Sequence, residues 1–514
     1  MPEFQPPIAQ PAPSAQAAHA AQPAHAAQPA PPGGPRPLPL LIGGDWRASA
    51  AERSAPVLDP AHGSELARVP FATAAEIDAA VDAARRAFPA WREVPVPERA
   101  LVMFRYKRLL EEHLEELARM VSRENGKLIA EARGEVRRGI EVVDFAAGMP
   151  TLAMGEAVEG VARKIDSHSV RVPLGVVAGI TPFNFPAMIP LWMFPLAITA
   201  GNTFVLKPSD RTPMTAVRLA ELLLAAGVPA GVLNLVHGGR EAVDALLDHP
   251  GVQAVSFVGS EPVARHVYAR AAAAGKRVQA LAGAKNHLVV LPDAADWDLA
   301  IEAVMSSAFG SAGQRCLAGS VALPVGAAAE PFLERLARAA EAVVVGDPLD
   351  EATGIGPVIR QESKDRILDY VERGLREGAR LLVDGRSRVP ESGFFVAPTI
   401  LDRIDPEMAV AREEIFGPVL SVIRVPTVEE AVALVNRSKY GNAASIFTRS
   451  GRDAWYFRTR VEAGMVGINV GVAAPMAFFP FAGWKGSFFG DLHATGKDAV
   501  RFYTETRVVM ERWE

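Results

Sequence analysis

A regular alternation of short apolar runs with longer helical stretches restricts the fold of this chain more than any other feature. After Pro173, the apolar runs predict buried strands at residues 175–180, 203–206, 232–236 and 254–258. Helical stretches lie between or after them, at about residues 213–226, 240–248 and 262–274. This alternation predicts a parallel sheet with right-handed crossovers, which binds nucleotides beyond the carboxyl ends of its strands. The ordinary dinucleotide fingerprint GxGxxG does not occur in this region.

A second alternating stretch runs from about residue 282 to residue 470 and predicts a second α/β domain. Its strand candidates include residues 286–291, 320–323 and 419–425.

The first part of the chain predicts mainly helices. Ordered structure is expected to begin near Leu40, and helical spacing extends from Thr73 to Met120. Three prolines divide that region into separate helices, namely Pro89, Pro95 and Pro97. Residues 124–147 predict another helix pair, which exposes Arg133, Arg137 and Arg138.

Composition excludes several classes of protein. A chain of 514 residues is too long for one simple core, so two or three domains are expected. The net charge of −5 provides no electrostatic footprint for nucleic acid or an anionic membrane. No uninterrupted apolar run reaches the roughly 18 residues that a membrane-spanning helix needs. The longest apolar stretch, residues 183–200, contains Asn184 and three prolines, so it predicts a loop and a buried helix.

Residues 1–39 consist mainly of Ala, Pro, Gln and His, and predict a disordered leader that forms no core. No basic residue precedes Arg36, whereas signal and transit peptides need positive charge near the start. One cysteine excludes an intrachain disulfide framework and fits a reducing compartment. The expected location is therefore the cytoplasm.

That single cysteine, Cys316, follows a run of small residues and one arginine in the segment FGSAGQRC. Small residues let a backbone approach a reacting centre closely, and a thiol is the most nucleophilic ordinary side chain near neutral pH. An isolated cysteine is more often an inert buried thiol. The neighbouring motifs favour a nucleophile here.

Five segments carry a resemblance to a known family: TPFNFP at 181–186, LKPSD at 206–210, FVGS at 257–260, GQRC at 313–316 and EEIFGP at 413–418. Their order and spacing resemble those of the aldehyde dehydrogenases, from about residue 40 to the C-terminus.

The resemblance implies an α/β aldehyde dehydrogenase-like fold with three parts. These are a Rossmann-type NAD-binding domain at residues 40–150 and 173–281, an α/β catalytic domain at residues 282–484, and a β oligomerisation arm at residues 151–172 and 485–514.

The resemblance also implies a role for each motif. Cys316 attacks the aldehyde carbon, and Asn184 with the Cys316 backbone N–H stabilises the resulting oxyanion. Preorganised donors of this kind contribute roughly 2.7–4 kcal/mol each. Hydride then passes to NAD. The implied cofactor-binding positions are Lys207 and Asp210 at the adenosine ribose, Ser260 by the pyrophosphate at a helix start, Glu414 with Phe416 at the nicotinamide ribose, and Thr181, Phe183, Arg211 and Ala282 along the cofactor. Asp210 would repel a 2′-phosphate, which favours NAD over NADP.

One departure from the common family pattern is informative. Most members carry ELGGK, whose glutamate activates water, but the corresponding stretch here is LAGAK, with Leu281 in the place of that base. Leucine accepts no proton, and water, with a pKa of about 15.7, is a poor nucleophile without a base. A thiol with a pKa of about 8–9 needs much less help. Leu281 therefore favours coenzyme A as the acceptor, with another carboxylate acting as base as the alternative.

Two arginines narrow the substrate. Arg315 directly precedes Cys316, and Arg138 lies in the helix whose family counterpart lines the substrate tunnel. Two converging guanidinium groups suit a substrate carboxylate, although either arginine alone more often forms a surface salt bridge.

With further segments near residues 283–287, 467–471 and 481–493, the chain is similar to the CoA-acylating subfamily that acts on methylmalonate and malonate semialdehydes. That subfamily yields propionyl-CoA or acetyl-CoA with loss of carbon dioxide. The sequence does not decide between the methylated and the unmethylated substrate. It also does not decide whether the enzyme serves valine, β-alanine or inositol breakdown.

The resemblance predicts a homo-oligomer, a dimer or a tetramer, and the strand-like end at residues 504–510 would leave an unpaired edge in a monomer. The alternatives are a hydrolytic NAD(P)-dependent aldehyde dehydrogenase for another carboxylated semialdehyde, a thiol acyltransferase that would need a histidine such as His287 near Cys316, and a non-catalytic protein. No metal-site spacing such as HExxH or paired CxxC occurs.

Overall fold

A computed structural model describes residues 36–294 and 297–513 of the chain. The predicted leader lies outside the described residues except for its last four positions. There the backbone N–H of Leu38 donates to Arg68 O at 2.7 Å, so the end of the leader is attached to strand β4 (Glu65–Pro70).

The alternation after Pro173 forms a sheet whose centre is parallel. In spatial order its eight strands are β2 (Asp45–Arg47), β1 (Leu40–Ile42), β9 (Leu233–Leu235), β8 (Thr203–Lys207), β7 (Val176–Ile180), β10 (Val252–Val258), β11 (Arg277–Leu281) and β21 (Phe488–Phe489). The order reverses between β7 and β10, because the chain builds outward to β9 on one side and to β11 on the other. Open α/β sheets bind ligands at such a reversal.

Helices cover both faces of this sheet, as strand residues alternate between two apolar clusters. One face packs on α1 (Ala74–Glu93), α8 (Arg240–Asp248) and α9 (Glu261–Ala273). The other packs on α2 (Val96–Glu112), α3 (Leu114–Asn125), α4 (Ile129–Ala147), α5 (Met149–Leu152), α6 (Met188–Thr199), α7 (Met214–Ala225) and α16 (Gly496–Phe502). Every strand and helix predicted between residues 175 and 274 is present, within two residues at each end.

The second alternating stretch forms a seven-stranded sheet, parallel except for its edge strand β14. In spatial order the strands are β14 (Arg380–Val383), β15 (Thr399–Asp402), β16 (Val419–Val422), β13 (Gly319–Pro324), β12 (Asn286–Val290), β18 (Ala443–Phe447) and β19 (Met465–Ile468). Its helices are α10 (Trp297–Phe309), α11 (Ala329–Glu341), α12 (Gln361–Arg376), α13 (Ala409–Arg412), α14 (Val428–Arg437) and α15 (Gly451–Arg460), with short 3-10 turns η1 (Gly310–Gly313) and η2 (Gly326–Ala328).

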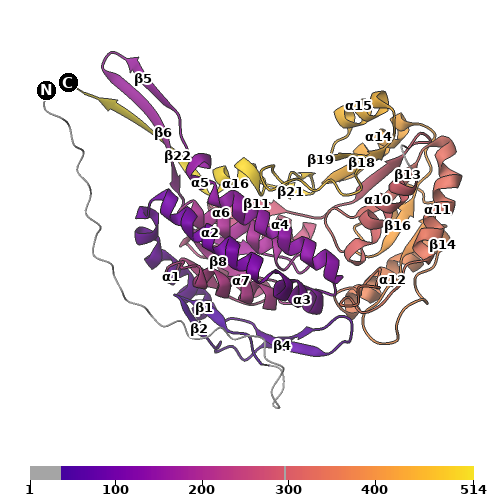
Figure 1. The fold of residues 1–514 in the computed structure, drawn as a ribbon, viewed down its shortest axis with the longest axis horizontal. Helices are drawn as coiled ribbons and strands as arrows, with labels where there is room; N and C mark the ends of the chain where they lie inside the picture. Colours follow the sequence, from indigo (N-terminus) through magenta and orange to yellow (C-terminus); the bar gives the residue numbers. More distant parts are fainter. Residues whose placement is uncertain (1–35, 295–296, 514) are drawn as a thin grey trace. The chain divides into compact units, whose positions relative to one another are not determined.

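Three smaller sheets complete the part of the fold that residues 36–294 and 297–513 form. Strands β5 (Ala157–Ala162), β6 (Ile165–Pro173) and β22 (Thr504–Arg512) pair antiparallel, although β22 is more than 300 residues from β6 in sequence. Figure 1 shows these three strands side by side. The other two are the hairpin of β3 (Ser54–Leu58) with β4, and the pair β17 (Tyr440–Gly441) with β20 (Trp484–Lys485).

Two helix boundaries differ from the sequence prediction. Pro89 lies inside α1 instead of ending a helix. The next turn is fixed by Trp91, which is buried and donates its indole N–H to Ile198 O at 2.9 Å, so tertiary contacts outweigh the lost helical bond. Residues 124–147 also do not form a helix pair, because α3 ends at the left-handed Gly126 and a single helix, α4, runs from Ile129 to Ala147.

No helix in the described part of the chain combines the length and the apolar character needed to cross a membrane. The apolar stretch that includes Asn184 forms a loop followed by the buried helix α6, as predicted.

Asn202 ties together three distant segments of the fold. Its side chain is fully buried and makes four hydrogen bonds: it accepts from the N–H groups of Leu174 and Gly175, and donates to Ala197 O and Tyr503 O. The start of β7, the end of α6 and the start of β22 therefore meet at one amide.

We expect Asn202→Ala to lower the free energy of unfolding by about 3–6 kcal/mol, because buried groups left without partners cost about 1–3 kcal/mol each. The matched control is Asn436→Ala, which removes two hydrogen bonds at the solvent-exposed end of α14 and should cost less than about 1 kcal/mol. Denaturant unfolding of both variants measures the difference. Equal losses would contradict the role assigned to Asn202.

Candidate active site

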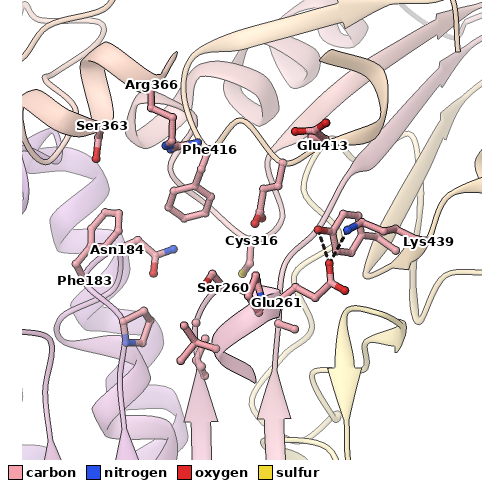
Figure 2. A pocket seen from close by; sticks show the side chains of 18 of the residues that line it. Phe183, Asn184, Ser260, Glu261, Cys316, Ser363, Arg366, Glu413, Phe416 and Lys439 are labelled. Carbon is pink, nitrogen blue, oxygen red and sulfur yellow. Dashed lines mark hydrogen bonds and ion pairs between the residues drawn. The ribbon is translucent and has the colours of Figure 1, made fainter. Parts of the chain in front are cut away.

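The main pocket opens where the order of the eight-stranded sheet reverses. It has a volume of about 1760 Å³ and is lined from the carboxyl ends of β7, β8 and β10 by Thr181, Lys207 and Ser260. The second sheet contributes lining residues from its own side, including Cys316 and Glu414. The parallel strands thus bring together the motifs that the sequence keeps apart (Figure 2).

The end of the pocket near β8 and β10 suits a dinucleotide. Gly259 follows β10, where an added Cβ would lie 2.4 Å from the Phe257 ring, so only glycine leaves this wall open. Helix α9 starts directly after Ser260, whose side chain makes no capping hydrogen bond. The N–H groups of its first turn have no helical partner and favour a phosphate. These residues fit the pyrophosphate of NAD.

Lys207, at the end of β8, is buried beside this wall. Its Nζ donates to Pro208 O at 2.8 Å and to Gly238 O at 2.9 Å. Burial lowers the pKa of Lys207 to about 8, and the charge of Asp210 opposes that shift. Lys207 and Asp210 both line the pocket, and their role at the adenosine ribose stays a prediction.

Three further cofactor candidates form one stack. The Arg211 guanidinium lies 5.0 Å from the centre of the Phe183 ring, and Phe183 meets Phe416 edge-on at 5.8 Å. Burial, followed by the charge of Arg360, lowers the pKa of Arg211 to about 10. Ala282 lines the same pocket.

Cys316 lies between η1 and β13, in a loop of unusual backbone. Ser311, Ala312 and Gly313 have φ values of 51°, 51° and 69° in succession. A Cβ on Gly313 would lie 2.2 Å from Gly417 O, so glycine is required there. The turn therefore packs closely against the EEIFGP segment at residues 413–418.

Two amides hold the cysteine itself. Asn286 Nδ2 and Asn442 Nδ2 both donate to Cys316 O at 2.8 Å. The main chain is thus fixed while the thiol lines the pocket. Burial raises the pKa of the Cys316 thiol to about 12, the Glu414 carboxylate adds to the rise, and Arg315 opposes it.

Asn184 follows β7 and is buried beside the thiol loop. Its Nδ2 donates to Gln314 O at 3.0 Å, two residues before Cys316. A primary amide has two N–H donors. Figure 2 shows the amide nitrogen directed toward the sulfur across the pocket, so the structure brings the two predicted catalytic residues together.

Glu414 lines the pocket and accepts a hydrogen bond from the backbone N–H of Ala284 at 2.9 Å. Burial raises the pKa of Glu414 to about 7.

At the position of the usual base, Leu281 is the last residue of β11 and is 4% exposed. It belongs to the apolar cluster against which Cys316 packs.

The two arginines do not converge on this pocket. Arg138 pairs with Glu141 at 2.8 Å and donates to Ala474 O and Pro475 O. Arg315 donates to the carbonyls of Ser306 and Ser307, and its Nε is buried with no hydrogen-bond partner among the described residues. Neither lines the main pocket.

Several lining residues were missed from the sequence. The Glu261 carboxylate, at the start of α9, accepts from Lys439 Nζ at 2.7 Å and from Tyr440 OH at 2.9 Å, the dashed contacts in Figure 2. Arg366 donates to Ile415 O at 2.6 Å behind Phe416. Glu261 follows the FVGS motif directly and could have been found there. The others lie in no motif.

Among the described residues, no cluster of three or more His, Cys, Asp or Glu side chains could hold a metal ion.

The aldehyde dehydrogenase family model matches residues 46–509. Among curated proteins, malonate-semialdehyde dehydrogenase 2 of Geobacillus thermodenitrificans (strain NG80-2) is 56% identical over 473 residues, which cover 92% of this chain and 98% of the relative. Malonate-semialdehyde dehydrogenase 1 of Geobacillus kaustophilus (strain HTA426) is 54% identical over 475 residues, covering 92% and 97%.

Solved structures agree with this assignment. The methylmalonate-semialdehyde dehydrogenase of Oceanimonas doudoroffii superposes with a TM-score of 0.91 at 48% identity, covering 93% of this chain and 99% of that one. A Sinorhizobium meliloti 1021 protein solved in complex with NAD gives a TM-score of 0.92 at 44% identity, covering 94% and 99%. The α/β fold predicted from the motifs is confirmed, and the chain belongs to the aldehyde dehydrogenase family.

Proposed function

We propose that this chain is an NAD-dependent, CoA-acylating dehydrogenase that converts methylmalonate and malonate semialdehydes to propionyl-CoA and acetyl-CoA. The observation that carries the proposal is that Cys316 and Asn184 line one pocket, while Leu281, in the apolar cluster against which Cys316 packs, takes the place of a base. The names of the curated relatives support the substrate class. The NAD complex of the S. meliloti protein supports the cofactor.

The chemistry begins at the thiol. The Cys316 thiol loses its proton to solvent, and the resulting thiolate attacks the aldehyde carbon. The carbonyl oxygen becomes an oxyanion that accepts from the free N–H of Asn184 and the backbone N–H of Cys316. The residues around Lys207, Ser260 and Glu414 would hold NAD, which would supply the acceptor for the hydride that the adduct loses as it becomes a thioester.

The thioester now carries a carboxylate on the neighbouring carbon. Loss of carbon dioxide breaks that carbon–carbon bond and leaves an enolate, whose oxygen the same donors stabilise. Protonation of the enolate carbon gives the saturated acyl group. The coenzyme A thiol then attacks the carbonyl and releases Cys316.

We propose that Arg315 and Arg138, which both lie outside the main pocket here, turn toward the thiol to bind the substrate carboxylate. The Nε of Arg315 is buried and has no hydrogen-bond partner among the described residues. It is therefore a donor available for a carboxylate. Arg138 would exchange its carbonyl contacts for the carboxylate, a stronger acceptor.

Glu414 favours one alternative, hydrolysis with this carboxylate as base. Its charge acts on Cys316, and a pKa of about 7 suits a general base. The acceptor assay below separates the two functions.

We also propose that the chain forms a homo-oligomer through the sheet of β5, β6 and β22. Its strands expose apolar side chains to solvent, among them Val158, Val161, Val508 and Met510, which are 50–68% exposed. Exposed apolar side chains on sheet edges favour pairing with another chain.

The acceptor assay follows NADH from malonate semialdehyde with and without coenzyme A, with acetyl-CoA measured in the same samples. We expect turnover to depend strongly on coenzyme A and acetyl-CoA to match the NADH formed, because Leu281 cannot activate water. Equal turnover without coenzyme A, with release of free acid, would instead establish hydrolysis.

The catalytic assignment predicts two variant phenotypes. Cys316→Ala should abolish NADH formation, and Asn184→Ala should lower kcat by about 10²–10³, the usual loss for one oxyanion donor. Both should bind NAD normally in fluorescence titrations. A Cys316→Ala protein that still reduces NAD would exclude the thioacyl mechanism.

The raised thiol pKa gives a third prediction. Alkylation of Cys316, the single cysteine, by iodoacetamide in the unliganded enzyme should accelerate about tenfold per pH unit from pH 7 to 10 without a plateau, as measured on the mass of the Cys316 peptide. Glu414→Gln removes a charge that raises this pKa, so it should speed alkylation, most clearly above pH 7 where Glu414 is ionised. Glu413→Gln, one residue away and bound to Tyr370, is the control. A plateau near pH 8 would contradict the raised pKa.

A further inference from the structure

The segment that carries Asn184 has no regular structure of its own. It runs from the end of β7 to the start of α6, so backbone hydrogen bonds of a helix or strand do not fix it. An oxyanion donor must nevertheless be held within about 0.5 Å of its working position. Groups outside the segment must therefore hold it.

Lys127 is one such group. It follows the left-handed Gly126 between α3 and α4, and its side chain is 1% exposed. The Nζ donates to the backbone carbonyl of Asn184 at 2.9 Å, forms an ion pair with Glu135, and lies 4.0 Å from the centre of the Phe185 ring. The ammonium thus contacts Asn184 and the residue after it.

Glu135 and Asn125 hold the segment on the two sides of Asn184. Glu135 Oε1 accepts from the N–H groups of Ala187 at 2.8 Å and Met188 at 3.2 Å, beyond Asn184. Before Asn184, Asn125 Nδ2 donates to Phe183 O at 3.0 Å. Three side chains, from the end of α3, the loop after it and α4, therefore make four contacts that fix the main chain around one amide.

Lys127 itself does not line the pocket, so it touches neither substrate nor cofactor there. A buried ion pair also adds little stability compared with apolar side chains of similar volume. The use of this pair is geometric, because its charge-assisted hydrogen bonds set the position of a carbonyl that an apolar side chain could not hold.

We propose that Lys127, oriented by Glu135, is a positioning residue that sets the Asn184 amide for the oxyanion. This inference rests on the proposed function, since it needs Asn184 to act as the oxyanion donor. Loss of Lys127 would release the Asn184 carbonyl and let the amide move away from the thiol.

A double-mutant cycle tests the proposal. The kcat for NADH formation from malonate semialdehyde with coenzyme A is measured for Lys127→Met, Asn184→Ala and the double variant. We expect Lys127→Met to lower kcat about 10- to 100-fold with KM for NAD changed less than about twofold. In the Asn184→Ala background the same substitution should cost less than about threefold, because groups that act through one another are not additive.

Glu124→Gln is the matched control. Glu124 is also buried, but it holds the start of α7 by accepting from the N–H groups of Met214 at 2.8 Å and Thr215 at 2.9 Å. It should lower the melting temperature with kcat within about twofold of the parent enzyme. If Lys127→Met does not fold, Glu135→Gln, which weakens the grip on Lys127, replaces it in the cycle.

The outcomes separate the two claims. The role of Lys127 would be overturned if the loss of kcat in the double variant equalled the product of the two single losses, or if Lys127→Met left kcat unchanged. Either result would leave the proposed function standing. An Asn184→Ala enzyme with normal kcat would overturn the oxyanion assignment, and the inference about Lys127 with it.

Discussion

The site depends on the two amide hydrogen bonds to the carbonyl of Cys316. Asn286 lies at the start of β12 and Asn442 lies just before β18. The amides that fix the Cys316 carbonyl therefore come from the amino ends of two neighbouring parallel strands of the second sheet. With its main chain fixed, the strained turn before it can direct the thiol toward Asn184, which comes from the other sheet. The nucleophile and its oxyanion donor therefore meet only because both sheets end at the same pocket.

Most strands and helices could be predicted from the sequence, because the spacing of apolar residues indicates which face of a helix or strand is buried. The exceptions are places where contacts distant in sequence decide the local structure. Pro89 remains helical because Trp91 is anchored to α6, and no local pattern contains that contact. The pairing of β22 with β6 was implied only by the family resemblance, because no local pattern joins segments so far apart in sequence.

The sequence predicted the site residues that lie in recognisable motifs. Cys316, Asn184, Lys207, Ser260 and Glu414 all reach one pocket. The two arginines show what a motif cannot give, because the direction of a long side chain depends on its neighbours, and both guanidinium groups contact carbonyls outside the main pocket. Lys127 and Glu135 were not singled out, since their roles come from backbone groups about 50 residues away.

In the proposed mechanism, the acyl group stays bound to Cys316 until a thiol accepts it. Mixing the enzyme with malonate semialdehyde and NAD, but no coenzyme A, and following NADH together with the mass of the Cys316 peptide tests it directly. We expect a burst of about one NADH per subunit, an acyl adduct on Cys316, and no further turnover until coenzyme A is added. Continued NADH formation with an unmodified Cys316 would contradict it.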